Sequence, residues 1–335
     1  MPRALVTGAT GLVGSHIVER LKQEGWQVRA LVREHSSATW LSAHQVDLAI
    51  GDVLDAVPFS SAAAGCDAIF HTAAAITPRG GWEAWRAINI DGTANAIAAA
   101  ESSGARLLHL SSVAVYGPGA RYRQDGPTTE LARMEPIPER AYYARSKRES
   151  EELVLAAHAE GRIWSTAVRP CVVYGPRDRQ FVPRAGRLFE LGVAPIIGDG
   201  QSTLAVVHAA NVADGAFRAV RHDAAGGRAF NLANDFPLSV EAFVKLAGIG
   251  LGRQLRIVRL PMRAARAGMH LLRAATRLRM GAGMYAMAAS TLDFLTRDNP
   301  FSSALARREL GWNPTMRPEQ GVPEAFRWWK KAARR

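Results

Sequence analysis

A glycine-rich turn near the N-terminus is the feature that most constrains the fold of this chain. The sequence TGATGLVG at residues 7–14 follows a strand-like run at residues 4–6 and opens a helical pattern over residues 12–23. Glycines let the backbone turn tightly and approach a pyrophosphate, and the N-terminus of the helix offers unpaired N–H groups and the positive end of its dipole. In this strand–turn–helix setting the glycines predict a dinucleotide site rather than an ordinary turn.

Further strand-like runs alternate with helical patterns through the first half of the chain. The runs fall at residues 27–32, 46–50, 68–73 and 106–111, and a long Ala-rich helix is expected over residues 82–101. This alternation is typical of an α/β fold with a Rossmann-type, doubly wound parallel sheet, whose ligands bind beyond the carboxyl ends of the strands.

The domain organisation follows from the point at which this alternation stops. From about residue 176 the pattern becomes irregular and mostly helical. We therefore expect residues 1–175 to form an NAD(P)-binding domain, to which residues 204–232 return. Residues 176–203 and 233–335 are expected to form a smaller, mostly helical substrate-binding part.

The second and third strands bear on which cofactor is bound. An acidic residue at the end of the second strand commonly binds the ribose 2′-hydroxyl of NAD, whereas an Arg accommodates the 2′-phosphate of NADP. Here the strand ends in Arg33, which favours NADP(H); alternatively Arg33 is merely exposed and Glu34 serves the ribose. Asp52 and Val53 close the third strand, where the Asp52 carboxylate is expected either to meet the adenine amino group or to cap a turn.

Three residues suggest the chemistry of hydride transfer. Tyr143 and Lys147 lie four apart on one face of a predicted helix, and Ser112 follows the fifth strand. A carbonyl that receives a hydride needs a proton and hydrogen-bond donors at its oxygen. A free Tyr has a pKa near 10, and a nearby ammonium lowers it by stabilising the phenolate. We expect Tyr143 to supply the proton, Lys147 to tune it and hold the nicotinamide ribose, and Ser112 to orient the substrate oxygen.

Several motifs in order along residues 1–235 carry a resemblance to a known family. They are TGATGLVG, GD at 51–52, HTAA at 71–74, NIDGT at 89–93, SSVAVYG at 111–117, YARSK at 143–147 and RPCVVYGP at 169–176. Together they resemble the extended (atypical) short-chain dehydrogenase/reductase family of the NAD-dependent epimerase/dehydratase superfamily. Residues 304–314, which end in ELGWNP, and the predicted helix around residues 328–329 also resemble this family.

The resemblance implies a Ser/Tyr/Lys triad, here Ser112, Tyr143 and Lys147, and a segment after Arg169 and Pro170 that passes beside the nicotinamide. It also implies a homodimer through the helices near residues 82–101 and 143–157. The expected cofactor contacts are Gly8, Thr10, Gly11, Leu12, Val13, Gly14, Arg33, Asp52, Val53, Thr72, Ala73, Ala74, Asn89, Ser111, Tyr143, Lys147, Arg169, Pro170, Val172 and Val173. The expected substrate contacts are Ala75, Val113, Tyr174 and His208.

Departures from the sugar-nucleotide branch of the family indicate the substrate class. Enzymes of that branch typically place an Arg–acid pair after a turn like GDG at 198–200, but here Leu204 and Ala205 carry no charge. The sequence VHAANVA at 207–213 instead resembles the 3β-hydroxysteroid dehydrogenase-like and carbonyl reductase branches. His208 within it is interpreted as a packing residue in preference to a catalytic one.

The charge is strongly basic but mostly dispersed. The chain has a net charge of +12, and its 37 Arg and 5 Lys are scattered, which argues against a nucleic-acid patch. The exception is residues 242–292, which contain no Asp or Glu but carry Lys245, eight Arg and many Leu and Met. This stretch is either a core-facing helix with a solvated basic face, or a pocket lid or peripheral membrane contact.

Cysteine and hydropathy patterns predict a reduced, cytoplasmic protein. Cys66 and Cys171 lie in or beside apolar runs, so both are expected to be buried free thiols, and no metal-ligand spacing is present. The strand pattern begins at once, which leaves no room for a signal peptide, and no apolar stretch is long enough for a membrane span.

The sequence therefore supports three hypotheses of different kinds. The first is an NADP(H)-dependent short-chain dehydrogenase/reductase that acts on an apolar or steroid-like ketone or secondary alcohol. The second is an NAD-dependent sugar-nucleotide epimerase or dehydratase, which would show no net cofactor turnover. The third is a non-catalytic NADP-sensing protein, against which the complete triad argues.

Overall fold

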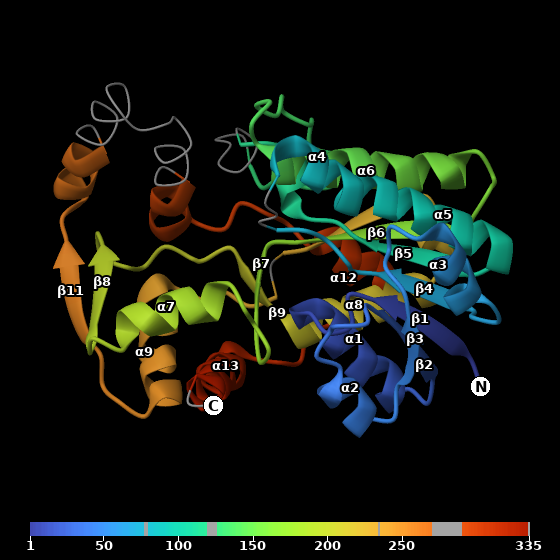
Figure 1. Ribbon diagram of the computed structural model, residues 1–335. Helices are drawn as coiled ribbons and strands as arrows, with labels where there is room; N and C mark the ends of the chain where they lie inside the picture. The colour runs from blue at the N-terminus through green and yellow to red at the C-terminus, as the bar shows by residue number, and fades with distance from the viewer. Residues whose placement is uncertain (77–79, 119–125, 234, 270–289, 334–335) are drawn as a thin grey trace. The chain divides into compact units, whose positions relative to one another are not determined.

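The computed structural model describes residues 1–76, 80–118, 126–233, 235–269 and 290–333, which form two compact units (Figure 1). The first unit comprises Met1–Val173, Val207–Asp235 and Phe301–Thr315, and the second comprises the rest of the chain. The chain passes from one unit to the other within β7 (Val172–Tyr174) and within β9 (Val206–His208). Each unit has its own buried core, so the two are described separately.

A seven-stranded sheet forms the centre of the first unit. Its strand order is β10-β6-β5-β4-β1-β2-β3, and every neighbouring pair is parallel. The chain runs outward from β1 to β3 and then returns to β4, so the strand order reverses between β1 and β4. The expected Rossmann-type, doubly wound parallel sheet is confirmed, with the strands β1 (Arg3–Thr7), β2 (Gln27–Val32), β3 (Asp47–Ile50), β4 (Ala68–His71), β5 (Arg106–Leu110), β6 (Ser165–Pro170) and β10 (Ala229–Leu232).

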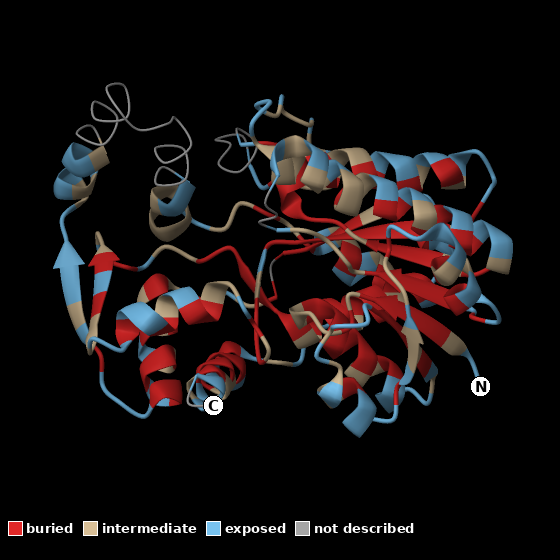
Figure 2. Ribbon diagram, viewed as in Figure 1, coloured by how far each residue is buried: buried red, intermediate tan, exposed pale blue. Residues whose placement is uncertain are grey.

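Helices cover both faces of this sheet (Figure 1). On one face α1 (Leu12–Gln23) packs on α8 (Ala209–Arg221), and on the other α5 (Gly92–Ser103) lies between α3 (Ala56–Ala63) and α6 (Tyr142–Ala159). Most strand residues are apolar and buried, and the edge strand β3 is the exception, with no buried residue (Figure 2). The shorter elements of the unit are α2 (Thr39–Ala43), α4 (Gly81–Arg86), η2 (Val113–Tyr116), η4 (Asp223–Ala225) and α12 (Ala304–Leu310).

The Ala-rich helix expected over residues 82–101 is interrupted. The π-helix η1 (Ala87–Asp91) separates α4 from α5. A π-turn holds one more residue per turn than an α-helix and commonly marks a functional position. Here it places the side chain of Asn89 inward, where it is only 2% exposed.

Residues 301–315 belong to the first unit, although the sequence pattern placed them in the substrate-binding part. The Phe301 ring stacks on Tyr116, and the Ser303 hydroxyl accepts a hydrogen bond from the Ala233 N–H at 3.0 Å. Farther along, the Trp312 indole donates to the Asn211 carbonyl at 2.9 Å. These contacts between distant segments attach residues 301–315 to the rest of the first unit. Local sequence periodicity does not predict them, because it reports only on residues that are close in sequence.

The second unit is built around an aromatic core. In it the Phe243 ring lies against Phe181 and Phe326, while Phe189 stacks on Phe326. A β-carbon on Gly186 would lie 2.4 Å from a ring carbon of Trp329, so close helix packing requires a glycine there. The helices are α7 (Phe181–Phe189), α9 (Val240–Leu251) and α13 (Pro318–Ala332), beside a two-stranded parallel sheet of β8 (Val193–Ile197) and β11 (Arg256–Leu260).

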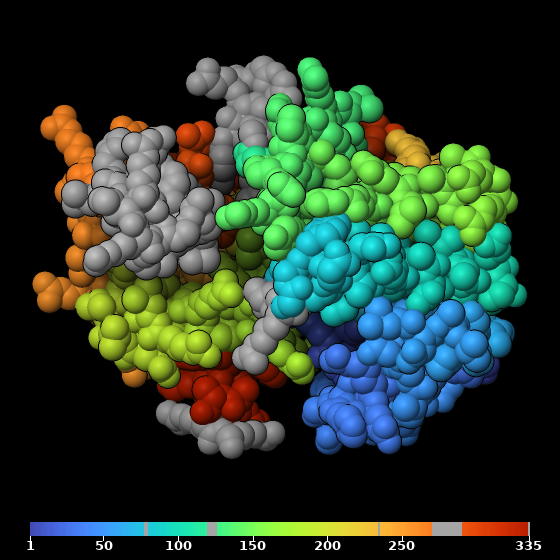
Figure 3. Space-filling view, turned by 45° about the horizontal axis from the view of Figure 1, so that its top comes forward, coloured from blue at the N-terminus to red at the C-terminus, as the bar shows by residue number. Residues whose placement is uncertain are grey.

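Two other sequence-based expectations concern the chain as a whole. Cys66 and Cys171 are buried free thiols, as predicted. Among the helices in the described part of the chain, none combines the length and the hydropathy that a bilayer-spanning segment needs. The segment around β11, orange in Figure 3, lies at the left edge of that view.

Candidate active site

The glycine loop joins β1 to α1 by a turn that tolerates no side chain at two of its positions. Gly8 has a φ of +67°, and a β-carbon there would lie 2.7 Å from the Ala73 nitrogen. A β-carbon on Gly14 would lie 2.3 Å from the Gly8 carbonyl oxygen. These two glycines therefore allow the close approach of β1, β4 and α1 that holds the loop in place.

The third glycine of the loop leaves the N-terminus of α1 available to a ligand. Gly11 caps this helix in an extended conformation, and no side chain makes a capping hydrogen bond there. Helix N-termini without such a cap offer their first N–H groups, and the positive end of the dipole, to an anion. The loop thus fits the pyrophosphate of a dinucleotide, with Thr10, Leu12 and Val13 lying directly along it.

The two residues expected to read the adenosine lie at the ends of β2 and β3. Arg33 is exposed just after β2, and its carbonyl accepts a hydrogen bond from the Ser36 N–H at 2.8 Å, which closes a turn. Asp52 follows β3 and accepts a hydrogen bond from the Leu54 N–H at 3.1 Å. The Asp52 carboxylate therefore caps a turn, one of the two roles expected from the sequence, and Val53 beside it is buried.

The catalytic candidates come together where β5 ends against α6. Lys147 lies in α6 with only 3% of its surface exposed, and its ammonium donates a hydrogen bond to the Leu110 carbonyl, the last of β5, at 2.5 Å. Ser112 follows two residues later, and its hydroxyl oxygen accepts the Ala114 N–H at 3.2 Å. Tyr143 is half-buried one turn before Lys147 on the same helix. The strand end and the helix therefore present the three side chains at one edge of the sheet.

Burial gives Lys147 unusual proton chemistry. Desolvation lowers the pKa of Lys147 to about 8, and the Glu151 carboxylate opposes this shift. Burial also lowers the pKa of His71 to about 3 and that of His109 well below its usual value, and the Lys147 charge adds to both shifts. Both imidazoles are neutral at pH 7, so neither adds a positive charge to that of Lys147.

A second tyrosine near β5 is unsuited to proton transfer. Burial raises the pKa of Tyr116 to about 12, so its hydroxyl stays protonated. That hydroxyl donates to the Asn231 amide oxygen and accepts from Arg169, each at 2.8 Å. Arg169 also forms a buried ion pair with Glu151, at 2.5 Å. The Arg169 guanidinium, expected beside the nicotinamide, is thus engaged within the fold.

Asn89 joins the loop after β4 to α6. Its amide accepts the Ala75 N–H at 2.7 Å and donates to the Ala75 carbonyl at 3.2 Å. The same amide donates to the Ser146 hydroxyl at 2.9 Å, and this hydroxyl donates to the Tyr143 carbonyl at 3.0 Å. Asn89, expected as a cofactor contact, therefore holds Ala75 and the first turn of α6 in fixed positions.

The remaining predicted contacts are distributed over both units. Thr72, Ala73 and Ala74 follow β4; Ser111 and Val113 follow β5; Pro170 ends β6, with Val172 and Val173 in β7. The buried Ser111 hydroxyl lacks a hydrogen-bond partner among the residues described, which leaves it able to bind a ligand group. Tyr174 belongs to the core of the second unit. The His208 ring accepts the Ala210 N–H at 3.1 Å and so caps α8, consistent with a packing role.

Two tryptophans beside the catalytic helix were not among the sequence-based candidates. Trp85 in α4 makes an edge contact with the Tyr143 ring, with centroids 5.9 Å apart. Trp82, one turn earlier, lies 5.9 Å from the Tyr142 ring and has the Arg145 guanidinium 3.8 Å above it. Their spacing of three residues was the available signal, because it places both rings on one helix face.

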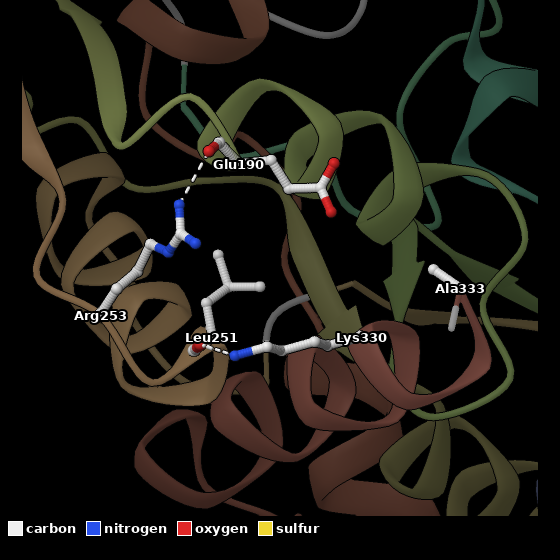
Figure 4. A pocket seen from close by; sticks show the side chains of 5 residues that line it. All are labelled: Glu190, Leu251, Arg253, Lys330 and Ala333. Atoms are coloured by element: carbon white, nitrogen blue, oxygen red, sulfur yellow. Dashed lines mark hydrogen bonds between the residues drawn. The ribbon is translucent and has the colours of Figure 1, made fainter. Parts of the chain in front are cut away.

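A shallow hollow in the second unit is separate from these groups. Glu190, Leu251, Arg253, Lys330 and Ala333 line it, and its volume is about 130 Å³ (Figure 4). Arg253 donates to the Glu190 carbonyl at 2.8 Å and Lys330 to the Leu251 carbonyl at 2.5 Å. Both cations are used within the unit, so the hollow offers no set of reactive groups.

Comparison with known proteins agrees with this geometry. Residues 4–233 match the NAD dependent epimerase/dehydratase family. A 2-alkyl-3-oxoalkanoate reductase of Stenotrophomonas maltophilia (strain K279a) is 30% identical over 330 residues, which cover 96% of this chain and 97% of that protein. A 4-hydroxy-2-methyl-3-oxo-4-farnesyl-3,4-dihydroquinoline-1-oxide ketoreductase of Stigmatella aurantiaca is 28% identical over 323 residues, or 96% of this chain and 94% of that one.

A solved structure shows the same fold. The UDP-glucuronic acid 4-epimerase of Bacillus cereus in complex with NAD superimposes with a TM-score of 0.74 at 18% identity, over 98% of this chain and 99% of that one. The chain belongs to the NAD dependent epimerase/dehydratase family and is an NAD-dependent oxidoreductase of the extended short-chain dehydrogenase/reductase type.

The burial of Lys147 predicts a direct titration. In protein labelled with ¹³C at the lysine ε-carbons, one of the five lysine signals should shift near pH 8, with the ammonium present below this pH and the amine above it. The same signal should be missing from Lys147→Met. If the signal that Lys147→Met removes does not titrate near pH 8, Lys147 is not the desolvated group described above.

Proposed function

We propose that this protein is an NADP(H)-dependent reductase or dehydrogenase that interconverts an apolar ketone and its secondary alcohol. The observation that carries the proposal is the buried Lys147 ammonium, which lies one helical turn from Tyr143 at the strand end occupied by Ser112. A desolvated cation at that place has a clear use in hydride chemistry, because it stabilises the charge that develops on a phenolate.

The bound nicotinamide supplies or accepts the hydride at the carbonyl carbon. In the reductive direction the Tyr143 phenol donates its proton to the carbonyl oxygen, so the oxygen becomes a hydroxyl and the phenol becomes a phenolate. The Lys147 ammonium, one helical turn away, stabilises the negative charge of this phenolate. The Ser112 oxygen already accepts the Ala114 N–H, which leaves its own O–H to donate to the substrate oxygen. In the oxidative direction each proton moves the opposite way.

The surroundings of Tyr143 support an apolar substrate. The Trp85 ring flanks the phenol, and Ile76, next to the clamped Ala75, is 51% exposed. The names of two relatives point the same way. The ketoreductase whose named substrate carries a farnesyl group and a 3-beta-hydroxysteroid dehydrogenase of Mycolicibacterium neoaurum both align with almost the whole chain.

The sugar-nucleotide alternative finds less support. Leu204 and Ala205 stand where that branch places its charged pair, and they are 3% and 8% exposed. Leu204 is part of the aromatic core of the second unit. A diphosphate requires cationic donors, which these buried apolar side chains do not provide.

Two further parts of the proposal concern the cofactor preference and the oligomeric state. The exposed Arg33 directly after β2 supports NADP(H), because an Arg at this point of the fold can bind a 2′-phosphate. A homodimer through α5 and α6 is supported by the small side chains of α5 and by Leu153 of α6, which is 39% exposed.

Replacing the proposed proton donor tests the mechanism. Tyr143→Phe should lower turnover by roughly 10²- to 10⁴-fold, because the phenol proton is lost while the ring remains. Cofactor affinity, measured by fluorescence titration with NADPH, should change little. The assay follows NADPH absorbance across a panel of ketones, sterols and sugar nucleotides. Full activity in Tyr143→Phe would refute the assignment, and NADPH binding without turnover by the unmodified protein would favour a sensor.

Replacing Arg33 tests the cofactor preference separately. Arg33→Ala should weaken NADPH binding far more than NADH binding, since only NADPH carries the 2′-phosphate. Isothermal titration of both cofactors measures the difference, and Arg86→Ala, an exposed arginine of α4, serves as a control. An equal loss for the two cofactors would show that Arg33 does not discriminate between them.

A further inference from the structure

The net charge of the chain is confined to one of its two units. The first unit contains 22 Lys and Arg against 22 Asp and Glu, whereas the second contains 20 against 8. The second unit therefore carries the whole net charge of +12. A surplus of this size on one part of a protein attracts anionic partners and steers their approach.

A sheet face made mostly of aliphatic side chains lies within this basic unit. β8 and β11 pair in parallel, with Arg256 opposite Val193 and Leu260 opposite Ile197. Alternate residues of a strand point to opposite faces. Ala194 and Ile196 are buried and so point inward. The opposite face, which we call the ribbon face, therefore consists of Val193, Pro195, Ile197, Arg256, Val258 and Leu260.

The ribbon face is accessible. Val258 is 40% exposed, Leu260 is 42% exposed, and Pro195 is exposed as well. Exposed aliphatic side chains gathered on one sheet face mark an interaction surface more often than an ordinary solvated one.

Three arginines lie on the ribbon face or follow it directly in the chain. Arg256 lies on it, and Arg263 and Arg266 follow in the helical turn of residues 262–269, three residues apart and therefore on one side. None of the three pairs with a carboxylate among the residues described, whereas Arg259 and Lys245 share Glu241. The three guanidinium groups thus remain able to bind an external anion.

We propose that the ribbon face and these three arginines dock the second unit on an anionic lipid surface. The guanidinium groups bind the headgroup phosphates, and the aliphatic side chains of the ribbon face enter the boundary between headgroups and acyl chains. This docking is independent of the reaction assigned to Tyr143, but it would bring the enzyme to the phase in which apolar ketones concentrate.

The chemistry of the face favours lipid over nucleic acid. Sites for single-stranded nucleic acid combine basic groups with aromatic side chains on which bases stack. The ribbon face is aliphatic, and aliphatic side chains gain free energy on leaving water for the lipid interface. A basic rim around an apolar centre matches the headgroup and acyl layers of a membrane surface.

Vesicle sedimentation of the full chain tests this proposal. The protein should bind vesicles that contain phosphatidylglycerol, bind phosphatidylcholine vesicles weakly, and lose affinity as salt rises. The triple variant Arg256→Gln, Arg263→Gln, Arg266→Gln should bind about 10²-fold more weakly, at roughly five-fold per arginine. The double variant Val258→Ser, Leu260→Ser should weaken binding while retaining the salt dependence.

A matched control distinguishes binding through the ribbon face and its arginines from binding through net charge alone. The triple variant Arg133→Gln, Arg140→Gln, Arg221→Gln removes the same charge from exposed positions of the first unit and should bind vesicles as the unmodified protein does. Equal losses in the two triple variants, no binding to anionic vesicles, or tighter salt-dependent binding to DNA would each overturn the proposal. Both triple variants should reduce a water-soluble ketone with NADPH at the same rate. A failure of the proposed reaction can therefore be distinguished from a failure of the proposed docking.

Discussion

The active-site geometry depends on one buried ammonium group. Lys147 of α6 donates its hydrogen bond to the Leu110 carbonyl at the end of β5 and so joins this helix to the strand that Ser112 follows. A charged amine is costly to bury, and here that cost appears as a pKa lowered to about 8. The hydrogen bond to Leu110 and the nearby Glu151 carboxylate offset part of this cost. This constraint determines where Tyr143 lies relative to the sheet.

Two hydrogen-bond networks hold α6 in this position. Asn89, from the π-turn, fixes the first turn of the helix through Ser146. Farther along the helix, Glu151 forms a buried ion pair with Arg169 of β6. Arg169 also donates a hydrogen bond to Tyr116. Glu151 lies one turn after Lys147, and its charge opposes the desolvation of the ammonium. The ion pair thus fixes α6 against β6, and the Glu151 carboxylate favours the charged form of Lys147.

The sequence predicted the parts of the molecule that depend on local pattern. The parallel sheet, the glycine turn and α1 agree with the structure, because residue spacing and turn chemistry act over short distances. The roles of Asn89 and Arg169 and the placement of residues 301–315 were not predictable in this way. They depend on contacts between distant segments, such as Asn89 with Ser146 and Trp312 with Asn211. The spacing of Trp82 and Trp85 indicated a shared helix face, but the contact of Trp85 with Tyr143 depends on tertiary packing.

In the proposed reaction a hydride passes between the nicotinamide and a ketone carbon beside Tyr143. NADPH deuterated at C4, on each face in turn, can be incubated with the protein and an apolar aryl ketone, and the alcohol analysed by mass spectrometry. The account predicts that one of the two labelled cofactors delivers its deuterium to the carbinol carbon, with one NADP⁺ formed for each alcohol. An alcohol without deuterium from either cofactor, or epimerisation of a sugar nucleotide with no net change in cofactor, would contradict it.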